Sequence, residues 1–180
     1  LPLRLRARVD TDLAPGVSPV VDALLPGDGS TDEEVWVLSH SSEPGALDNA
    51  SGCCLSLEIA RMLGLLIAAG KLPRPRRAIR FLSAVESEGY YPLVSRLKLE
   101  GALPRVAAAL ALDSIGSDSR QSGGILRLFR SPDFNPTCAD SLLEEIIAAA
   151  ANLPNERVGA ETYELFPWRT GPYFPNNDNF

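Results

Sequence analysis

Histidine is scarce in this chain, which has 180 residues and a single imidazole, at His40. Cysteine is also rare, since only Cys53, Cys54 and Cys138 are present. Adjacent cysteines rarely pair with each other, because a disulfide needs Cα atoms about 5.5 Å apart and converging Cβ vectors. The sequence therefore shows no disulfide framework, and we expect its stability to come from a hydrophobic core.

Long apolar runs and excess basic charge are missing as well. No uninterrupted run reaches the roughly 18–20 residues of a membrane-spanning helix, and the richest stretch, residues 62–69, stops at Gly70. The net charge is −6, which disfavours a nucleic-acid partner. We expect neither a membrane nor a nucleic acid as partner. No signal-peptide pattern is visible, so the compartment stays unassigned.

What is present is a globular composition, with 45% hydrophobic and 22% charged residues. Strand-like and helix-like patterns alternate, which predicts an α/β domain with a largely parallel sheet and helices on its faces. The expected strands are residues 3–9, 17–27, 34–40, 77–86, 106–113 and 123–131. The expected helices are residues 49–69, 90–99 and 139–153, and the aromatic tail, residues 164–180, is expected to be loop. We expect residues 1–180 to form one domain, as a fragment of a longer chain.

Three polar residues stand at the carboxyl ends of expected apolar strands: His40, Glu86 and Asp113. Asp48 stands where the following helix begins. In open α/β sheets, ligands bind outside the carboxyl ends of the strands, so these groups are expected at one edge. A neutral imidazole with two or three carboxylates is a suitable zinc shell. A buried core histidine and an aspartate that caps a helix are the alternative interpretations.

Four segments carry a family resemblance, in order, between residues 34 and 116. They are VWVLSH, GALDNASGCCLSLEIARML, PRRAIRFLSAVESEGYYPL and ALALDSIG. With these segments the chain resembles the catalytic core of zinc-dependent aminopeptidases of peptidase family M28, in an aminopeptidase-like branch. The resemblance implies a zinc-exopeptidase-like α/β sandwich.

The resemblance also implies roles for the strand-end residues. His40 and Asp113 would hold one metal ion, Asp48 would bridge two, and Glu86 would be the general base that deprotonates a water.

The chain departs from the family pattern at the second metal. Ser87 stands where a glutamate ligand is expected, and Glu88 is a candidate substitute for it. Asn179 stands where the tail would carry a histidine ligand, and an amide is a poor zinc ligand. The serine at position 42 replaces the aspartate that would orient the first histidine. One zinc ion is therefore favoured over two, and a protein without metal stays open.

Two functional hypotheses follow. The first is a metal-dependent aminopeptidase-like hydrolase that cleaves N-terminal residues from peptides, with weak activity or none. The alternative is a non-catalytic relative of the peptidase fold that acts as a binding or scaffolding module. Whether the protein is an enzyme is left open at this stage. In either case the expected partner is a peptide or a peptide-like ligand.

Overall fold

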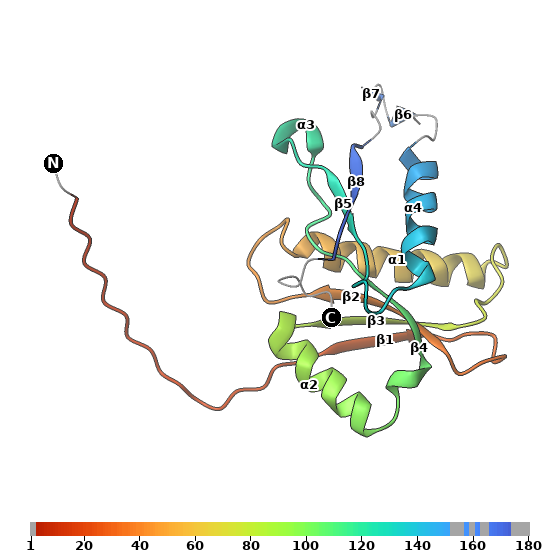
Figure 1. Cartoon of the computed structure of the whole chain (residues 1–180), viewed down its shortest axis with the longest axis horizontal. Helices are drawn as coiled ribbons and strands as arrows, with labels where there is room; N and C mark the ends of the chain where they lie inside the picture. Colours follow the sequence, from red (N-terminus) through yellow and green to blue (C-terminus); the bar gives the residue numbers. More distant parts are fainter. Residues whose placement is uncertain (1–2, 152–156, 159–160, 163–165, 174–180) are drawn as a thin grey trace.

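The fold is built on a four-stranded sheet, in a computed structural model that describes residues 3–151, 157–158, 161–162 and 166–173. The strand order is β1-β3-β2-β4. In the centre, β2 (Glu34–His40) runs parallel to β3 (Ala78–Ala84) and to β4 (Val106–Ala111). At one edge, β1 (Val21–Leu25) runs antiparallel to β3 (Figure 1). The predicted mixed, mostly parallel sheet is therefore confirmed.

Two helices cover opposite faces of this sheet (Figure 1). They are α1 (Ala50–Ala68) and α2 (Glu86–Leu99). Because successive side chains of a strand point to opposite faces, each strand feeds both layers. Trp36 and Leu82 pack in the cluster that includes residues of α2, and Val37 and Phe81 pack in the cluster that includes residues of α1. This α/β sandwich places the carboxyl ends of β2, β3 and β4 on the same side.

The second half of the chain adds short elements. They are η1 (Leu103–Arg105), α3 (Ser119–Ser122), β5 (Leu126–Phe129), α4 (Cys138–Ala151), β6 (Arg157–Val158), β7 (Glu161–Thr162) and β8 (Trp168–Gly171). β5 and β8 form a separate parallel pair, in which Leu126 lies opposite Trp168. The prediction that the whole tail is loop was therefore wrong for residues 168–171, because pairing with a distant strand orders a segment that has no strand pattern of its own.

The predicted first strand was also wrong. Residues 3–9 form no strand, and they run away from the sheet as an extended segment (Figure 1). Leu3 and Leu5 are 95% and 91% exposed. Their alternation with arginines has the period of a strand, but a strand also needs a partner for its backbone hydrogen bonds. The described fold gives residues 3–9 no such partner.

The boundary between β3 and α2 differs from the prediction too. β3 ends at Ala84, and α2 begins at Glu86 rather than near Tyr90. Two acidic residues in the first helical turn, Glu86 and Glu88, suit the positive end of the helix dipole. A Cβ at Gly89 would lie 2.9 Å from the Cβ of Ala84, so glycine lets the helix start this close to the strand. Glu86 is therefore a helix residue and not the last residue of a strand.

Helix α1 has the length of a membrane-spanning helix, although Glu58 and Arg61 interrupt its apolar residues. Among the described residues, it is the one helix long and apolar enough to span a membrane, and 11% of its most apolar stretch is buried. Core helices of globular proteins can have the same length and composition. Ile59, Ala60 and Leu63 of α1 pack on the sheet cluster of Val37 and Phe81.

Candidate metal centre

The register of the sheet brings three of the predicted site residues together. His40 is the last residue of β2 and lies opposite Ala84, two residues before Glu86. On the other side of β2, Leu38 lies opposite Ala111, the last residue of β4. His40 and Asp113 each follow two residues later, so they also lie near each other. Parallel strands that end together thus place His40 between Glu86 and Asp113.

Two aspartates approach one nitrogen of the His40 ring. The Nε2 atom lies 3.4 Å from Oδ1 of Asp113 and 3.5 Å from Oδ1 of Asp48. The ligand atoms of these three residues all lie within 4.8 Å of one another. The His40 side chain is only 4% exposed, whereas Asp48 and Asp113 are 53% and 30% exposed. The imidazole therefore forms the buried floor of a site that opens to solvent at its carboxylates.

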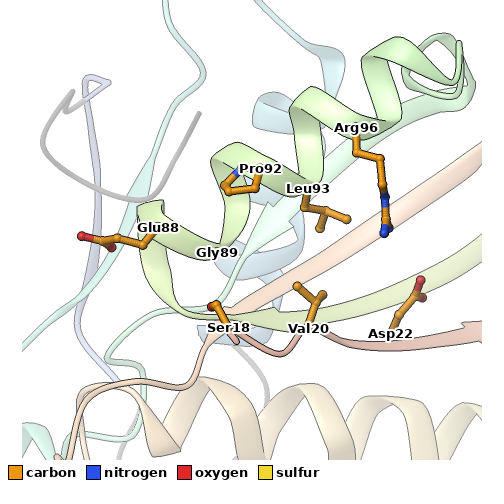
Figure 2. Close-up of a pocket in the computed structure, with 8 residues that line it drawn as sticks. All are labelled: Ser18, Val20, Asp22, Glu88, Gly89, Pro92, Leu93 and Arg96. Carbon is orange, nitrogen blue, oxygen red and sulfur yellow. The ribbon is translucent and has the colours of Figure 1, made fainter. Parts of the chain in front are cut away.

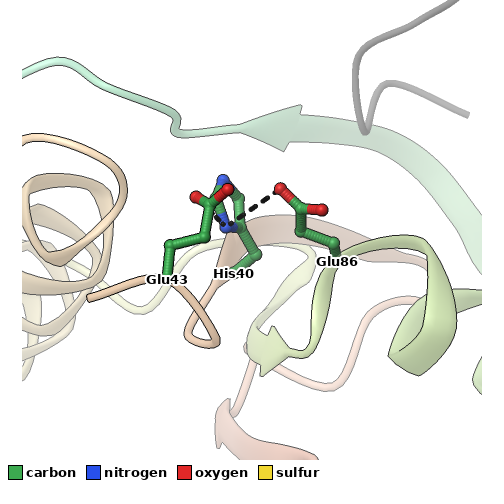
Figure 3. Close-up of side chains that lie close together, drawn as sticks. All are labelled: His40, Glu43 and Glu86. Carbon is green, nitrogen blue, oxygen red and sulfur yellow. Dashed lines mark ion pairs between the residues drawn. The ribbon is translucent and has the colours of Figure 1, made fainter. Parts of the chain in front are cut away.

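Two glutamates approach the other ring nitrogen (Figure 3). The Nδ1 atom lies 3.4 Å from Oε2 of Glu43 and 3.7 Å from Oε1 of Glu86. Glu43 comes from the loop after β2, and Glu86 comes from the start of α2. Sequence reasoning missed Glu43, although its place three residues after His40, before the Pro44–Gly45 turn, was a usable signal.

The carboxylates of the site repel one another. The pKa of Glu43 is raised to about 7, first by a hydrogen bond with Asp48, and then by desolvation and by the negative charges of Asp48 and Glu86. The charge of His40 acts in the opposite direction. A raised carboxyl pKa beside other carboxylates indicates a site with surplus negative charge. A divalent cation would offset that charge.

Asn49 organises the segments that carry both aspartates. It is the N-cap of α1, and its side chain is almost fully buried. Its Oδ1 accepts hydrogen bonds from the backbone N–H of Gly52 (3.0 Å) and of Ser114 (3.2 Å). Its Nδ2 donates to the carbonyl of Leu112 at 2.9 Å. Because Asn49 caps the helix, Asp48 does not have that role, and its carboxylate lies beside the His40 ring. The peptide bond between Asp48 and Asn49 is cis.

The small residues of this segment allow the close approach of helix and strand. A Cβ at Gly52 would lie 2.1 Å from the carbonyl oxygen of Leu112, and one at Gly45 would lie 2.4 Å from that of Asp48. Such contacts are not tolerated, so both positions require glycine. The pattern GALDNASG therefore has a steric cause in this fold, beyond any chemistry of its aspartate.

Two further groups fix the end of β2. The Tyr90 hydroxyl of α2 donates to the carbonyl of Ser39 at 2.6 Å and lies 3.0 Å from that of Leu82. The thiol of Cys53 donates to the carbonyl of His40 at 3.1 Å. The backbone around His40 is thus held from α2 on one face and from α1 on the other.

Three predicted positions remain: Ser87, Glu88 and Asn179. Ser87 is the second residue of α2 and is half-buried. Glu88 is exposed and lines a different groove, of about 400 Å³, between α2 and the residues around β1 (Figure 2). Figure 2 shows its carboxylate pointing away from the other side chains of that groove. Asn179 lies outside the described residues.

The donor atoms suit a metal ion. Within the described part of the chain, two groups of side chains could hold one, and both include His40: one with Asp48 and Asp113, the other with Glu43 and Glu86. One imidazole nitrogen and two carboxylate oxygens, with an open side toward solvent, match the ligand types of a catalytic zinc site. The metal-binding and catalytic roles of individual residues stay predictions.

Comparisons with known proteins identify the family of the chain and a similar fold. A sequence model of the family described as Peptidase family M28 matches residues 21–170. Among solved structures, the chain is similar to the crystal structure of a candidate peptidase from Clostridium acetobutylicum, with 22% identity and a TM-score of 0.59. The similarity covers 87% of this chain but only 30% of that one. No curated protein matches the chain.

Proposed function

This chain belongs to peptidase family M28, and from that membership we propose that it is the metal-binding core of a hydrolase that removes N-terminal residues from peptides. Family membership makes it a peptidase-type protein. The aminopeptidase specificity and the activity are our proposal. The chain covers only 30% of the length of the similar Clostridium structure.

One observation carries the proposal, the convergence of His40, Asp48 and Asp113. Their ligand atoms come from the ends of two parallel strands and the start of α1, and they lie within 4.8 Å of one another. We propose that these residues hold one zinc ion. When bound, such an ion lowers the pKa of a water from about 15.7 towards 7 and polarises the scissile carbonyl.

The proposed chemistry of the chain itself depends on Glu86. At the start of α2, its Oε1 lies 3.7 Å from Nδ1 of His40, at the edge of the same cluster of carboxylates. As general base, it would accept a proton from the attacking water and return it to the leaving amine. The buried imidazole would orient the site while the exposed carboxylates remain accessible to a peptide.

A second candidate function is a peptide-binding module without catalysis. It is favoured by Ser87, which offers no carboxylate where the family pattern places a ligand of the second metal. His40 is moreover the only histidine of the chain. One ion would then have to activate the water and polarise the carbonyl alone, so we expect a low rate even if the protein is active.

The discriminating experiment is the substitution Glu86→Gln. Glutamine keeps the volume and polarity of the side chain but cannot accept the proton of the water. We expect hydrolysis of aminoacyl-amide substrates by the zinc-loaded protein to fall about 10²–10⁴-fold, the usual cost of losing a general base. Zinc content and circular dichroism should stay unchanged.

The matched control is Glu100→Gln, which makes the same change at the exposed C-terminal end of the same helix. It should retain the wild-type rate. Wild-type activity that does not respond to Glu86→Gln would contradict the proposed base. A zinc-loaded protein that binds peptides but hydrolyses none would favour the binding module.

A further inference from the structure

The two nitrogens of the His40 ring face different partners, and this asymmetry has chemical consequences. Asp48 and Asp113 approach Nε2, whereas Glu43 and Glu86 approach Nδ1. A neutral imidazole carries one N–H and one lone pair, and a metal ion takes the lone pair. An ion bound with the two aspartates therefore requires the Nδ1 atom to carry the proton, and that proton requires an acceptor.

Glu43 is the better placed of the two acceptors. Its Oε2 lies 3.4 Å from Nδ1, compared with 3.7 Å for Oε1 of Glu86 (Figure 3). A carboxylate that accepts a hydrogen bond from the imidazole N–H also becomes a weaker base. If Glu43 accepts the hydrogen bond from Nδ1–H, Glu86 remains free of that role, so the two glutamates can have separate roles.

The loop that carries Glu43 is held close to the ring by its own backbone. Gly45 forms an isolated β-bridge with Asn49, and the backbone N–H of Ala50 donates to the carbonyl of Gly45 at 3.3 Å. These contacts tie the end of the loop, immediately after Pro44, to the start of α1. The backbone of the loop that carries Glu43 is consequently held at one end by β2 and at the other by the start of α1.

We propose that Glu43 is a positioning residue of the site: it holds the Nδ1 proton of His40 and thereby presents Nε2 to an ion bound with Asp48 and Asp113. The inference rests on the proposed function, because it assumes the ion at that place. Glu43 acts through His40 in this role and does not itself bind the metal.

The first test is the zinc affinity of Glu43→Gln, measured at a fixed pH by competition with a chromophoric chelator. Removing the charged acceptor should weaken zinc binding about 10–100-fold, the usual effect of losing the partner of a ligating histidine. The control Glu145→Gln makes the same change at an exposed position of α4 and should bind zinc like wild type. If Glu43→Gln does not fold, as judged by circular dichroism, Glu43→Ala carries the same expectation.

The second test reads the ring directly, because nitrogen-15 NMR of labelled histidine reports on His40 alone in this single-histidine chain. In the zinc-loaded wild type we expect a protonated Nδ1 and a metal-bound Nε2. In Glu43→Gln the Nδ1 resonance should shift, whereas Glu145→Gln should leave it in place.

Three results would overturn the inference. Zinc bound through Nδ1 would make Glu43 a metal ligand instead of a positioning residue. Equal zinc affinity of wild type and Glu43→Gln would show that the ring needs no help from Glu43, and the proposed function would stand. A wild type that binds no zinc would overturn the proposed function together with this inference.

Discussion

His40 shows how much a single residue contributes to this site. Its ring is almost fully buried, and four carboxylates from three different segments lie within 3.4 to 3.7 Å of its two nitrogens. Burial fixes the position of the ring, and the surrounding negative charge makes the site attractive to a cation. The imidazole is therefore the residue around which the other ligands are placed.

Asn49 is the residue on which we expect the geometry to depend most. Asn49→Ala removes a helix cap, worth about 1 kcal/mol, and leaves the buried Leu112 carbonyl without its donor, at about 1–3 kcal/mol. The free energy of unfolding in urea should therefore fall by about 2–4 kcal/mol. Asn135→Ala, at an exposed turn, is the control and should change it by less than about 0.5 kcal/mol. Equal effects of the two substitutions would refute the role of Asn49.

At the residue scale, the sequence predicted part of the site. His40, Asp48 and Asp113 do converge, because residues that follow neighbouring parallel strands reach the same edge. Glu43 was missed because a loop residue carries no periodic signal, and its distance from His40 depends on how the chain turns at Gly45. The capping role was assigned to Asp48 as one alternative, but Asn49 performs it.

Helix α1 and strand β4 are the two elements whose contact holds the aspartates in place. A Cβ at Gly52 would collide with the Leu112 carbonyl oxygen and with Oδ1 of Asn49, at 2.1 and 2.3 Å. By contrast, Gly64 of the same helix has no atom within 4 Å of the position of its Cβ. Replacing each of these glycines by alanine therefore separates the effect of steric contact on stability from the effect of helix propensity.

Gly52→Ala should destabilise the protein by about 1–3 kcal/mol, because the helix must move away from β4. Gly64→Ala should stabilise it by about 0.5–1 kcal/mol, since alanine loses less backbone entropy in a helix. Thermal denaturation followed by circular dichroism measures both. Zinc affinity should fall only in Gly52→Ala, and a stabilised Gly52→Ala would mean that helix and strand are not in close contact.

The elements themselves were predictable where hydrophobic periodicity is strong. The segments of β2, β3, β4, α1 and α4 were expected within a few residues of their observed bounds. Prediction failed where pairing decides the structure, since residues 3–9 have a strand pattern without a partner and residues 168–171 have a partner without the pattern. Helix α2 begins four residues before the predicted start, because the prediction assigned its acidic first turn to the end of a strand.

At the scale of the whole molecule, the parallel centre of the sheet explains why one edge carries the chemistry. β2, β3 and β4 deliver their carboxyl ends to the same side, while α1 and α2 cover the two faces. The sheet class could be predicted from the alternation of strands and helices. The antiparallel edge strand β1 and the separate β5–β8 pair could not, because strand order and direction are properties of the complete fold.

The most direct measurement is the number of zinc ions that each chain retains after loading and extensive dialysis, determined by elemental analysis. The account predicts one ion in the wild type, because His40, Asp48 and Asp113 form one ligand set and Ser87 offers no carboxylate for a second. It predicts none in His40→Ala and in Asp113→Asn, with circular dichroism confirming that the variants are folded. Two ions in the wild type, none at all, or one ion retained by the folded variants would contradict it.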